Sequence, residues 1–228
     1  MSLTDSNDLD RPLPIGKLSV ESQILVLRSY VAFYEREKRA ASYKDVAAIS
    51  AINETSVSSC KGFWESVGLL IQEDGKSRPS ISAIEFSKRY SSNTSEAWAV
   101  FRSAIKDCWF VKQLAMSMQL KPVQIEGEIV DQLSQAAGAV KSDKKADDSV
   151  KKLVELLKTC SFLQQGEGEK TLTLRSDSPS VPPLEVQDSD ESITVIVANE
   201  RYSIDSSLLK AFVKEHGKRT SDTDYKLD

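Results

Sequence analysis

The sequence predicts a mainly helical protein with small β hairpins, an α+β chain in which one order of elements occurs twice. Apolar residues recur at helical spacing over most of residues 17–160, which is typical of amphipathic helices packed on a core. Two pairs of short apolar runs, each pair joined by a glycine-containing turn, are typical of β hairpins. We therefore expect two helix–helix–helix–hairpin units, followed by a short strand-and-helix piece.

The first unit is expected at residues 17–94, after a flexible leader at residues 1–16 that contains two prolines. Three helical patterns follow one another in this unit. Each begins directly after a residue whose side chain can accept a hydrogen bond from the first helical turn. These capping residues are Ser19, Ser42 and Asn53.

The third helical pattern ends at Gly68, a residue type that commonly terminates helices. The apolar run Leu69–Ile71 predicts a strand, and the Asp74-Gly75 pair predicts a hairpin turn after it. Arg78–Ile81 is the expected returning strand, and Ala83–Tyr90 the helix that closes the unit.

This order of elements resembles a winged helix. The resemblance is carried by Tyr43–Ala47 as the second helix, Val57–Gly68 as the recognition helix and Leu69–Ile81 as the wing. The layout of the whole chain is similar to that of prokaryotic winged-helix proteins of unassigned function. The resemblance implies the fold, and it implies no known activity.

The second unit, expected at residues 95–175, has the same order of elements without repeating the residues of the first. Its first helix is a long amphipathic pattern that stops before Pro122, and an exposed, charged loop precedes its third helix. The expected elements are a helix at Ser95–Met118, a helix at Ile125–Ala137, a loop at Gly138–Asp148, a helix at Ala146–Cys160, and strands at Phe162–Gln164 and Thr171–Leu174.

The remaining residues predict an acidic linker at 176–191, a strand-and-helix segment at 192–217 and a disordered tail at 218–228. Within the middle segment, Ile193–Val197 and Arg201–Ile204 are expected to pair as strands. A helix is expected to follow from Asp205 or Ser206 to Gly217.

The composition argues against several classes of protein, namely membrane-spanning proteins and secreted disulfide-linked proteins. The longest apolar runs are far shorter than the roughly 18–20 residues that cross a bilayer, so we expect no membrane partner and a cytoplasmic protein. Cys60, Cys108 and Cys160 are odd in number and lie in helical patterns, so reduced thiols are expected. The two helical units are near neutral, and acidic residues outnumber basic ones at both ends of the chain.

No motif for catalysis, for a cofactor or for a metal is found. His216 is the only histidine, so a serine–histidine–aspartate triad or a histidine-containing zinc site would have to be built on this one residue. Its place near the expected end of a helix favours a capping or solvated role. We therefore expect a protein that is not an enzyme and that binds no cofactor.

The functional candidates are surface residues that suit contacts with a DNA backbone. Small hydroxyl side chains near the start of a recognition helix can approach phosphates closely, and basic residues on a wing or helix can neutralise them. The expected DNA-binding residues are Thr55, Ser56, Ser58, Ser59, Lys61, Lys76 and Arg78 in the first unit, and Lys144, Lys145, Lys151, Lys152 and Lys170 in the second.

Two functions remain open from the sequence. The first is a transcriptional regulator that binds double-stranded DNA with tandem winged helices. The second is a protein–protein interaction scaffold, which the net charge of −4 favours because DNA-binding domains are usually basic. A third possibility is that a small-molecule effector binds near Trp98, Phe101 and Trp109. We prefer the simpler interpretation that these aromatic side chains belong to the hydrophobic core. The oligomeric state is left open.

Overall fold

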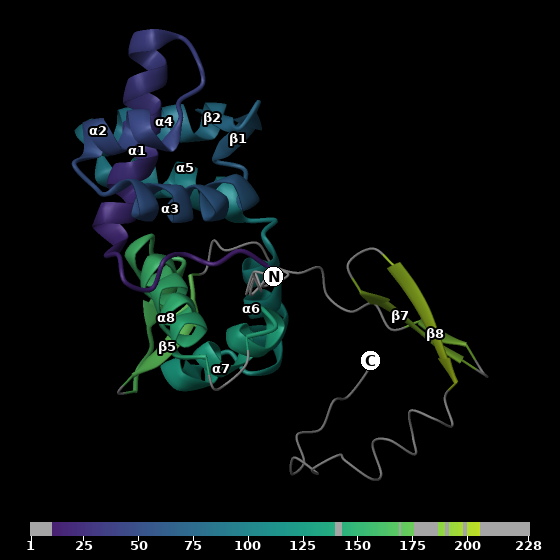
Figure 1. Cartoon of the computed structure of the whole chain (residues 1–228). Coiled ribbons are helices and arrows are strands. Elements are labelled where there is room, and N and C mark those ends of the chain that lie inside the picture. Colours follow the sequence, from purple (N-terminus) through teal and green to yellow (C-terminus); the bar gives the residue numbers. More distant parts are fainter. Residues whose placement is uncertain are drawn as a thin grey trace, which may run out of the picture. The chain divides into compact units, whose positions relative to one another are not determined.

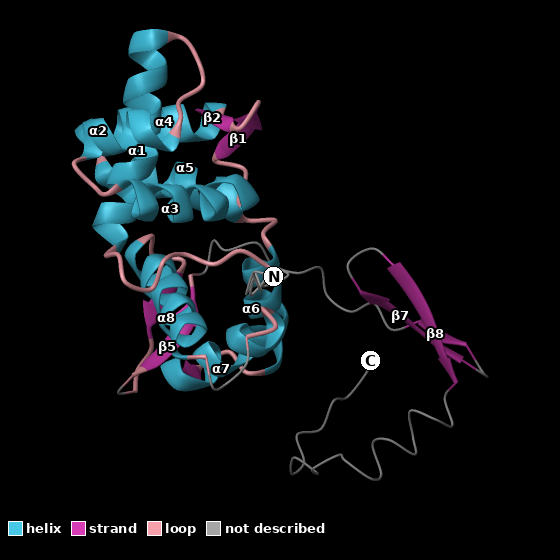
Figure 2. Ribbon diagram, in the orientation of Figure 1, coloured by secondary structure: helices cyan, strands magenta, loops and turns pink. Residues whose placement is uncertain are grey.

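The computed structural model describes residues 11–139, 143–168, 170–175, 187–189, 192–197 and 200–205. In this part of the chain helices dominate, and short antiparallel strands form three small sheets (Figure 1, Figure 2). The expected mainly helical α+β class is therefore confirmed. The chain splits into two compact units, Met1–Pro179 and Ser180–Asp228. Within the first unit we call residues 20–105 the first half and residues 109–175 the second half.

The first half begins with three helices, and each starts where the sequence predicts. The side-chain oxygens of Ser19, Ser42 and Asn53 accept hydrogen bonds from backbone N–H groups in the first turn of the helix that follows. Gly68 ends the third helix with a positive φ of 73°. The elements are α1 (Val20–Glu37), α2 (Tyr43–Ser50), α3 (Glu54–Ser66), β1 (Leu70–Glu73), β2 (Lys76–Pro79), α4 (Ile81–Ser92) and α5 (Thr94–Ile105).

The β1–β2 hairpin turns at Asp74 and Gly75, as predicted, and both residues have positive φ. Its second strand starts earlier than expected: β2 covers Lys76–Pro79, and Ile81 already belongs to α4. A single residue outside the hairpin extends the sheet. Ala41 and Ser77 exchange two backbone hydrogen bonds of 2.9 Å, which places the segment between α1 and α2 beside β2.

The second half repeats this order. Its elements are α6 (Trp109–Leu120), β3 (Gln124–Ile125), α7 (Glu126–Ala136), α8 (Lys144–Thr159), β4 (Leu163–Gln165) and β5 (Thr171–Leu174). The strand order in the sheet is β3-β5-β4, so β3 pairs with β5 as Ala41 pairs with β2. Helix α8 begins within the stretch that was expected to be a loop, because Asp143 caps it and the helix starts at Lys144, two residues before the expected Ala146.

The prediction of one long helix at Ser95–Met118 is wrong. Helix α5 ends at Ile105, Cys108 has extended backbone angles (φ −67°, ψ 148°), and α6 starts at Trp109. Helix α5 packs against α4 and so belongs to the first half, because the ring centre of Phe86 on α4 lies 5.4 Å from that of Trp98 and 5.5 Å from that of Phe101. Helix α6 is therefore the first helix of the repeat in the second half.

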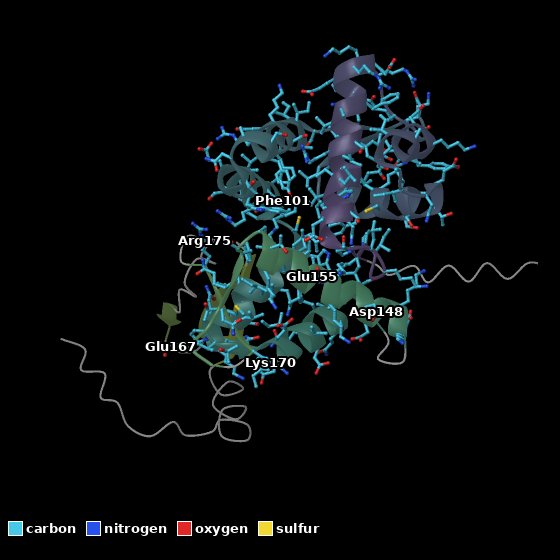
Figure 3. All side chains as sticks on the ribbon, turned by 90° about the vertical axis from the view of Figure 1, so that its left-hand side faces the viewer. Phe101, Asp148, Glu155, Glu167, Lys170 and Arg175 are labelled. Atoms are coloured by element: carbon cyan, nitrogen blue, oxygen red, sulfur yellow. The ribbon has the colours of Figure 1, made fainter. Side chains whose placement is uncertain are left out.

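One hydrophobic core runs through both halves. The ring of Trp64 on α3 packs edge-on against Phe101, and Phe63 lies 6.4 Å from Phe110 on α6. Phe101, labelled in Figure 3, lies at the junction where the first half meets the second. Arg102 continues this junction, since its guanidinium donates a 2.6 Å hydrogen bond to the carbonyl of Cys160. Trp98 and Phe101 are buried in this core.

Residues 11–18, most of which were assigned to the leader, pack along the junction. Arg11 lies 5.1 Å from the centre of the Trp109 ring and donates a 2.9 Å hydrogen bond to the carbonyl of Ala136. Gln23 on α1 is buried and exchanges hydrogen bonds with the backbone of Ile15. It donates a further bond to the carbonyl of Leu18. This segment therefore joins the first half to the second.

The second compact unit contains an antiparallel sheet with strand order β6-β7-β8. Strands β7 (Ser192–Val197) and β8 (Glu200–Asp205) pair as predicted, and β6 (Gln187–Ser189) lies within the expected linker. The predicted helix after Asp205, including His216, and the tail at 218–228 lie outside the described residues. None of the helices that the structure describes is both long and apolar enough to cross a membrane.

Candidate nucleic-acid interface

Helix α3 presents an uncharged, hydroxyl-rich face to solvent. Val57, Cys60 and Trp64 point into the core at helical spacing, which leaves the opposite side of the helix free. Of the predicted contact residues, Thr55, Ser58 and Ser59 are exposed and Ser56 is half-buried. The structure therefore brings these four hydroxyl groups together near the N-terminus of α3.

The hairpin is held against α3 by two polar contacts. Ser77 on β2 is completely buried and donates a 2.7 Å hydrogen bond to Oε1 of Glu65 on α3. Lys61, one turn earlier on α3, donates to the carbonyl of Gly75 in the hairpin turn at 3.4 Å. It also lies 3.5 Å from Glu65, and its side chain is only 17% exposed. Lys61 therefore positions the hairpin and is less available to a ligand than predicted.

The two basic residues that were predicted on the hairpin differ in their surroundings. Arg78 forms an ion pair with Glu73 across the two strands, so much of its charge is balanced within the hairpin. Lys76 is exposed and forms no ion pair with any described residue. Of this pair, Lys76 is therefore the stronger candidate for a phosphate contact.

Three further basic residues flank Ala41 in the sequence, Lys38 and Arg39 before it and Lys44 after it, and the sequence did not single them out. The bridge between Ala41 and Ser77 brings the end of α1 and the start of α2 to the hairpin. We call the exposed basic side chains of this segment, together with Lys76, the basic cluster. Its members are Lys38, Arg39, Lys44 and Lys76.

Asp45 is an acid close to Arg39 and Lys76 of the basic cluster. Hydrogen bonds from Ser42 are the main cause that lowers the pKa of Asp45, and the charges of Arg39 and Lys76 lower it further. Arg39 reaches Asp45 only at 4.0 Å, and its guanidinium lies over the ring of Phe33 at 4.7 Å. Asp45 therefore stays ionised and balances only part of the positive charge around it.

Helix α8, the counterpart of α3, carries lysines that are paired with acids. Lys151 lies 2.6 Å from Asp147, and Lys152 lies 2.5 Å from Glu155. The hydrogen bond that Lys151 donates to Asp147 is the main cause that raises the pKa of Lys151. Lys158 lies 2.9 Å from Glu126 on α7. Two of the four predicted lysines on this helix, Lys151 and Lys152, are therefore neutralised within the chain.

The other predicted residues of the second half are exposed and form no ion pair with any described residue. Lys144 and Lys145 occupy the first turn of α8, where the helix dipole disfavours positive charge. Lys170 lies in the β4–β5 turn with a positive φ of 57°, and Figure 3 shows it at the lower end of the second half with Glu167. Lys144 and Lys145 therefore lie at the start of α8, whereas Lys170 lies beyond its end, in the β4–β5 turn that follows the helix.

Apolar side chains are exposed on the second half near β3. Leu120, in the last turn of α6, is 86% exposed, and Ile125 on β3 is 51% exposed. Met116 and Val123, each 45% exposed, extend this group along α6 and toward β3. We call these four residues the apolar patch. Strand β3 is an outer strand of its sheet.

The described residues offer little for covalent or metal chemistry. Cys60 and Cys160 are buried, and burial raises the pKa of their thiols to about 12 and about 11. Burial also raises the pKa of the half-buried Cys108 to about 11. No three histidine, cysteine, aspartate or glutamate side chains among the described residues are grouped so as to hold a metal ion.

Comparisons of the chain with protein-family models, with curated proteins and with solved structures found no match.

Proposed function

We propose that this chain is a non-enzymatic tandem winged-helix protein that binds double-stranded DNA as a transcriptional regulator. The observation that carries the proposal is the exposed hydroxyl face of α3, which lies beside a hairpin fastened to the same helix through Ser77 and Glu65. A helix of this kind fits the major groove, and the adjoining hairpin reaches the neighbouring backbone.

The order of elements supports a winged helix in each half. Each half has a helix, a short strand, two further helices and a hairpin, and the short strand pairs with the second hairpin strand. In the first half the short strand is the single residue Ala41, and in the second it is β3. Under this proposal α3 and α8 are the two recognition helices.

The exposed side chains of α3 determine how selective and how strong the proposed DNA binding would be. The hydroxyl groups of Thr55 and Ser58 can donate to phosphates and accept from base edges, but such contacts discriminate between bases weakly. The hydroxyl of Ser59 already donates to the carbonyl of Thr55 at 2.9 Å. Electrostatic attraction then has to come from residues around the helix, and the near-neutral first half provides only a modest amount. We therefore expect salt-dependent binding of moderate affinity.

Fluorescence anisotropy with a labelled random duplex, at about 50 and about 200 mM salt, tests the proposal. Ser58→Glu places a negative charge on the exposed face of α3, and Ser103→Glu makes the same change on the exposed side of α5. We expect binding that weakens with salt, a loss of roughly tenfold or more in Ser58→Glu, and wild-type affinity in Ser103→Glu. Absence of binding at the lower salt concentration would show that the proposal is wrong.

A second candidate function, a protein–protein interaction scaffold, is favoured by the apolar patch. Exposed apolar groups next to an outer strand suit contact with another protein surface. The simplest partner is a second copy of the chain, since two identical edges can pair about a twofold axis.

Sedimentation velocity over a range of concentrations tests this second candidate. Leu120→Asp and Ile81→Asp are matched changes, because the two side chains are 86% and 84% exposed and only Leu120 belongs to the apolar patch. If the wild type forms a dimer that Leu120→Asp abolishes and Ile81→Asp retains, the interaction-scaffold function is supported. A chain that stays monomeric at every concentration contradicts it.

A further inference from the structure

We propose that the two halves are not equivalent in DNA binding: the basic cluster of the first half contacts the phosphates, and α8 of the second half does not. This inference rests on the proposed function and deepens it. It assigns the phosphate contacts to Lys38, Arg39, Lys44 and Lys76, of which only Lys76 is suggested by the sequence.

The first step is the position of the cluster. The two 2.9 Å hydrogen bonds between Ala41 and Ser77 hold the start of α2 beside the hairpin. The Ser77–Glu65 bond then holds the hairpin on α3. The basic cluster and the hydroxyl face of α3 are therefore carried on one rigid set of elements, as a single binding surface requires.

The second step is the state of the cations. Lys38, Lys44 and Lys76 are exposed and form no ion pair with any described residue. Arg39 is oriented by Phe33, and its contact with Asp45 is at 4.0 Å, the outer limit of an ion pair. A phosphate can therefore form ion pairs with these side chains without first breaking a close ion pair within the protein.

The third step is the acid within the cluster. Oδ2 of Asp45 already accepts hydrogen bonds from the backbone N–H of Ser42 at 2.8 Å and from its hydroxyl at 2.7 Å. This carboxylate is committed to capping α2, and it offsets one of the four positive charges. Outside the cluster, Asp74 in the hairpin turn and Glu54 at the start of α3 are exposed, and they limit the attraction.

The fourth step is the comparison with the second half. The strand that corresponds to Ala41 is β3, and its flanking lysine, Lys121, is paired with Glu128 at 2.7 Å. The adjacent exposed residues are apolar, Val123 and Ile125. Along α8, three lysines are paired with acids at 2.5–2.9 Å. A phosphate would have to displace these acids, and only Lys144 and Lys145 in the first turn of α8 are unpaired among the described residues, so this helix offers fewer free cations than the basic cluster.

The test compares two triple variants of the full chain, each of which removes three positive charges. The cluster variant is Lys38→Gln, Lys44→Gln and Lys76→Gln. It keeps Arg39, because replacing Arg39 would also remove its contact with Phe33. The control variant is Lys151→Gln, Lys152→Gln and Lys158→Gln, the three lysines of α8 that are paired with acids. Circular dichroism and the thermal midpoint establish that both variants fold like the wild type.

The measurement is the slope of log affinity against log salt for a labelled random duplex. Each lost phosphate contact lowers this slope by about 0.9. We expect the cluster variant to lose about 2–3 in slope and roughly 10–100-fold in affinity at about 50 mM salt. The control variant should stay within about twofold of the wild type.

Two results would overturn the inference while leaving DNA binding intact. One is an equal loss in both variants, which means that the halves contribute alike. The other is wild-type binding by the cluster variant, which means that the phosphates are held elsewhere. A wild-type chain that binds no duplex at about 50 mM salt would overturn the proposed function together with the inference.

Discussion

The hydroxyl of Ser77 on β2 donates a 2.7 Å hydrogen bond to the carboxylate of Glu65 on α3. Ser77 is completely buried, and its backbone is held by Ala41 on the other side. Glu65 in turn lies 3.5 Å from Lys61, which contacts the hairpin turn. One buried serine therefore connects the three parts of the candidate interface: the start of α2, the hairpin and α3.

Removal of this hydroxyl should destabilise the chain and loosen the hairpin. We expect Ser77→Ala to lower the free energy of unfolding by about 1–3 kcal/mol, because a buried hydrogen bond to a charged group is lost. Urea denaturation measures this change. Ser103→Ala is the control, since Ser103 is exposed and its loss should have an effect within about 0.5 kcal/mol. Equal stability of the two variants would contradict the prediction.

Gly16 is a second position at which the structure predicts a clear loss of stability on substitution. A Cβ atom at Gly16 would lie 2.6 Å from Cβ of Asp148 and 2.7 Å from its carbonyl carbon. Since backbone cannot move aside cheaply, we expect Gly16→Ala to lower the free energy of unfolding by about 1–3 kcal/mol.

Gly127 is the matched control for Gly16. A Cβ there meets no atom within 4 Å, and the residue lies in α7. Gly127→Ala should therefore leave stability unchanged or raise it by up to about 1 kcal/mol. Thermal or urea unfolding of both variants gives the comparison. A tolerated Gly16→Ala would mean that residues 11–18 do not pack along α8 in solution.

The cysteines should react slowly in the folded chain. Burial disfavours the thiolate, so the pKa of Cys108 rises from 9.0 to about 11, and the reactive fraction at pH 8 falls about 100-fold. Labelling with a thiol reagent should accelerate about tenfold per pH unit up to about pH 11. The same reagent on the chain in denaturant is the control. Fast labelling of the folded chain at pH 8 would contradict the burial of Cys60 and Cys160 and the raised pKa of the half-buried Cys108.

The same shifts have a consequence for stability. Between about pH 9 and pH 11 the unfolded chain loses thiol protons that the folded chain retains. The free energy of unfolding should therefore fall as pH rises through this range. Replacing Cys60 and Cys160 by alanine would remove most of this pH dependence, at the cost of a smaller core.

Neutralisation of Asp74 should strengthen DNA binding. Asp74 is exposed in the hairpin turn beside Lys76 and has a positive φ of 47°, a conformation that asparagine tolerates well. Asp74→Asn removes a repulsive charge without altering the turn, so we expect roughly two- to tenfold tighter binding at low salt. Glu85→Gln on α4 removes the same charge at an exposed site outside the candidate interface. Similar gains in both variants would indicate only an effect of net charge.

Local signals in the sequence predicted most helix starts and the first hairpin. Ser42 and Asn53 cap the helices that follow them, and Gly68 and Gly75 have the positive φ that their positions require. These signals act within a few residues, so they can be read without knowing the fold.

The break between α5 and α6 could not be predicted, because the apolar spacing continues across it. Trp98, Phe101, Ile105 and Trp109 fit one helical pattern, yet Trp98 and Phe101 belong to the core around α4 and Trp109 is contacted by Arg11. Periodicity shows which face is apolar, and it does not show which partner buries that face.

The candidate site was predicted only in part, because charge balance depends on distant pairs. Lys158 meets Glu126 from another helix, and Lys61 meets the hairpin turn. The Ala41–Ser77 bridge, which assembles the basic cluster, is a contact of two single residues. The hydroxyl face of α3 was predictable, since it follows from the helix period alone.

The contact of Phe63 with Phe110 has a consequence for how the chain folds. Each half has the order of elements of a complete small domain, but aromatic side chains from both halves fill one interior. Cutting between α5 and α6 would expose those rings to water on both pieces, and neither piece would keep its full core. The two halves are therefore expected to unfold together as one cooperative unit, in a single transition that includes both α3 and α8.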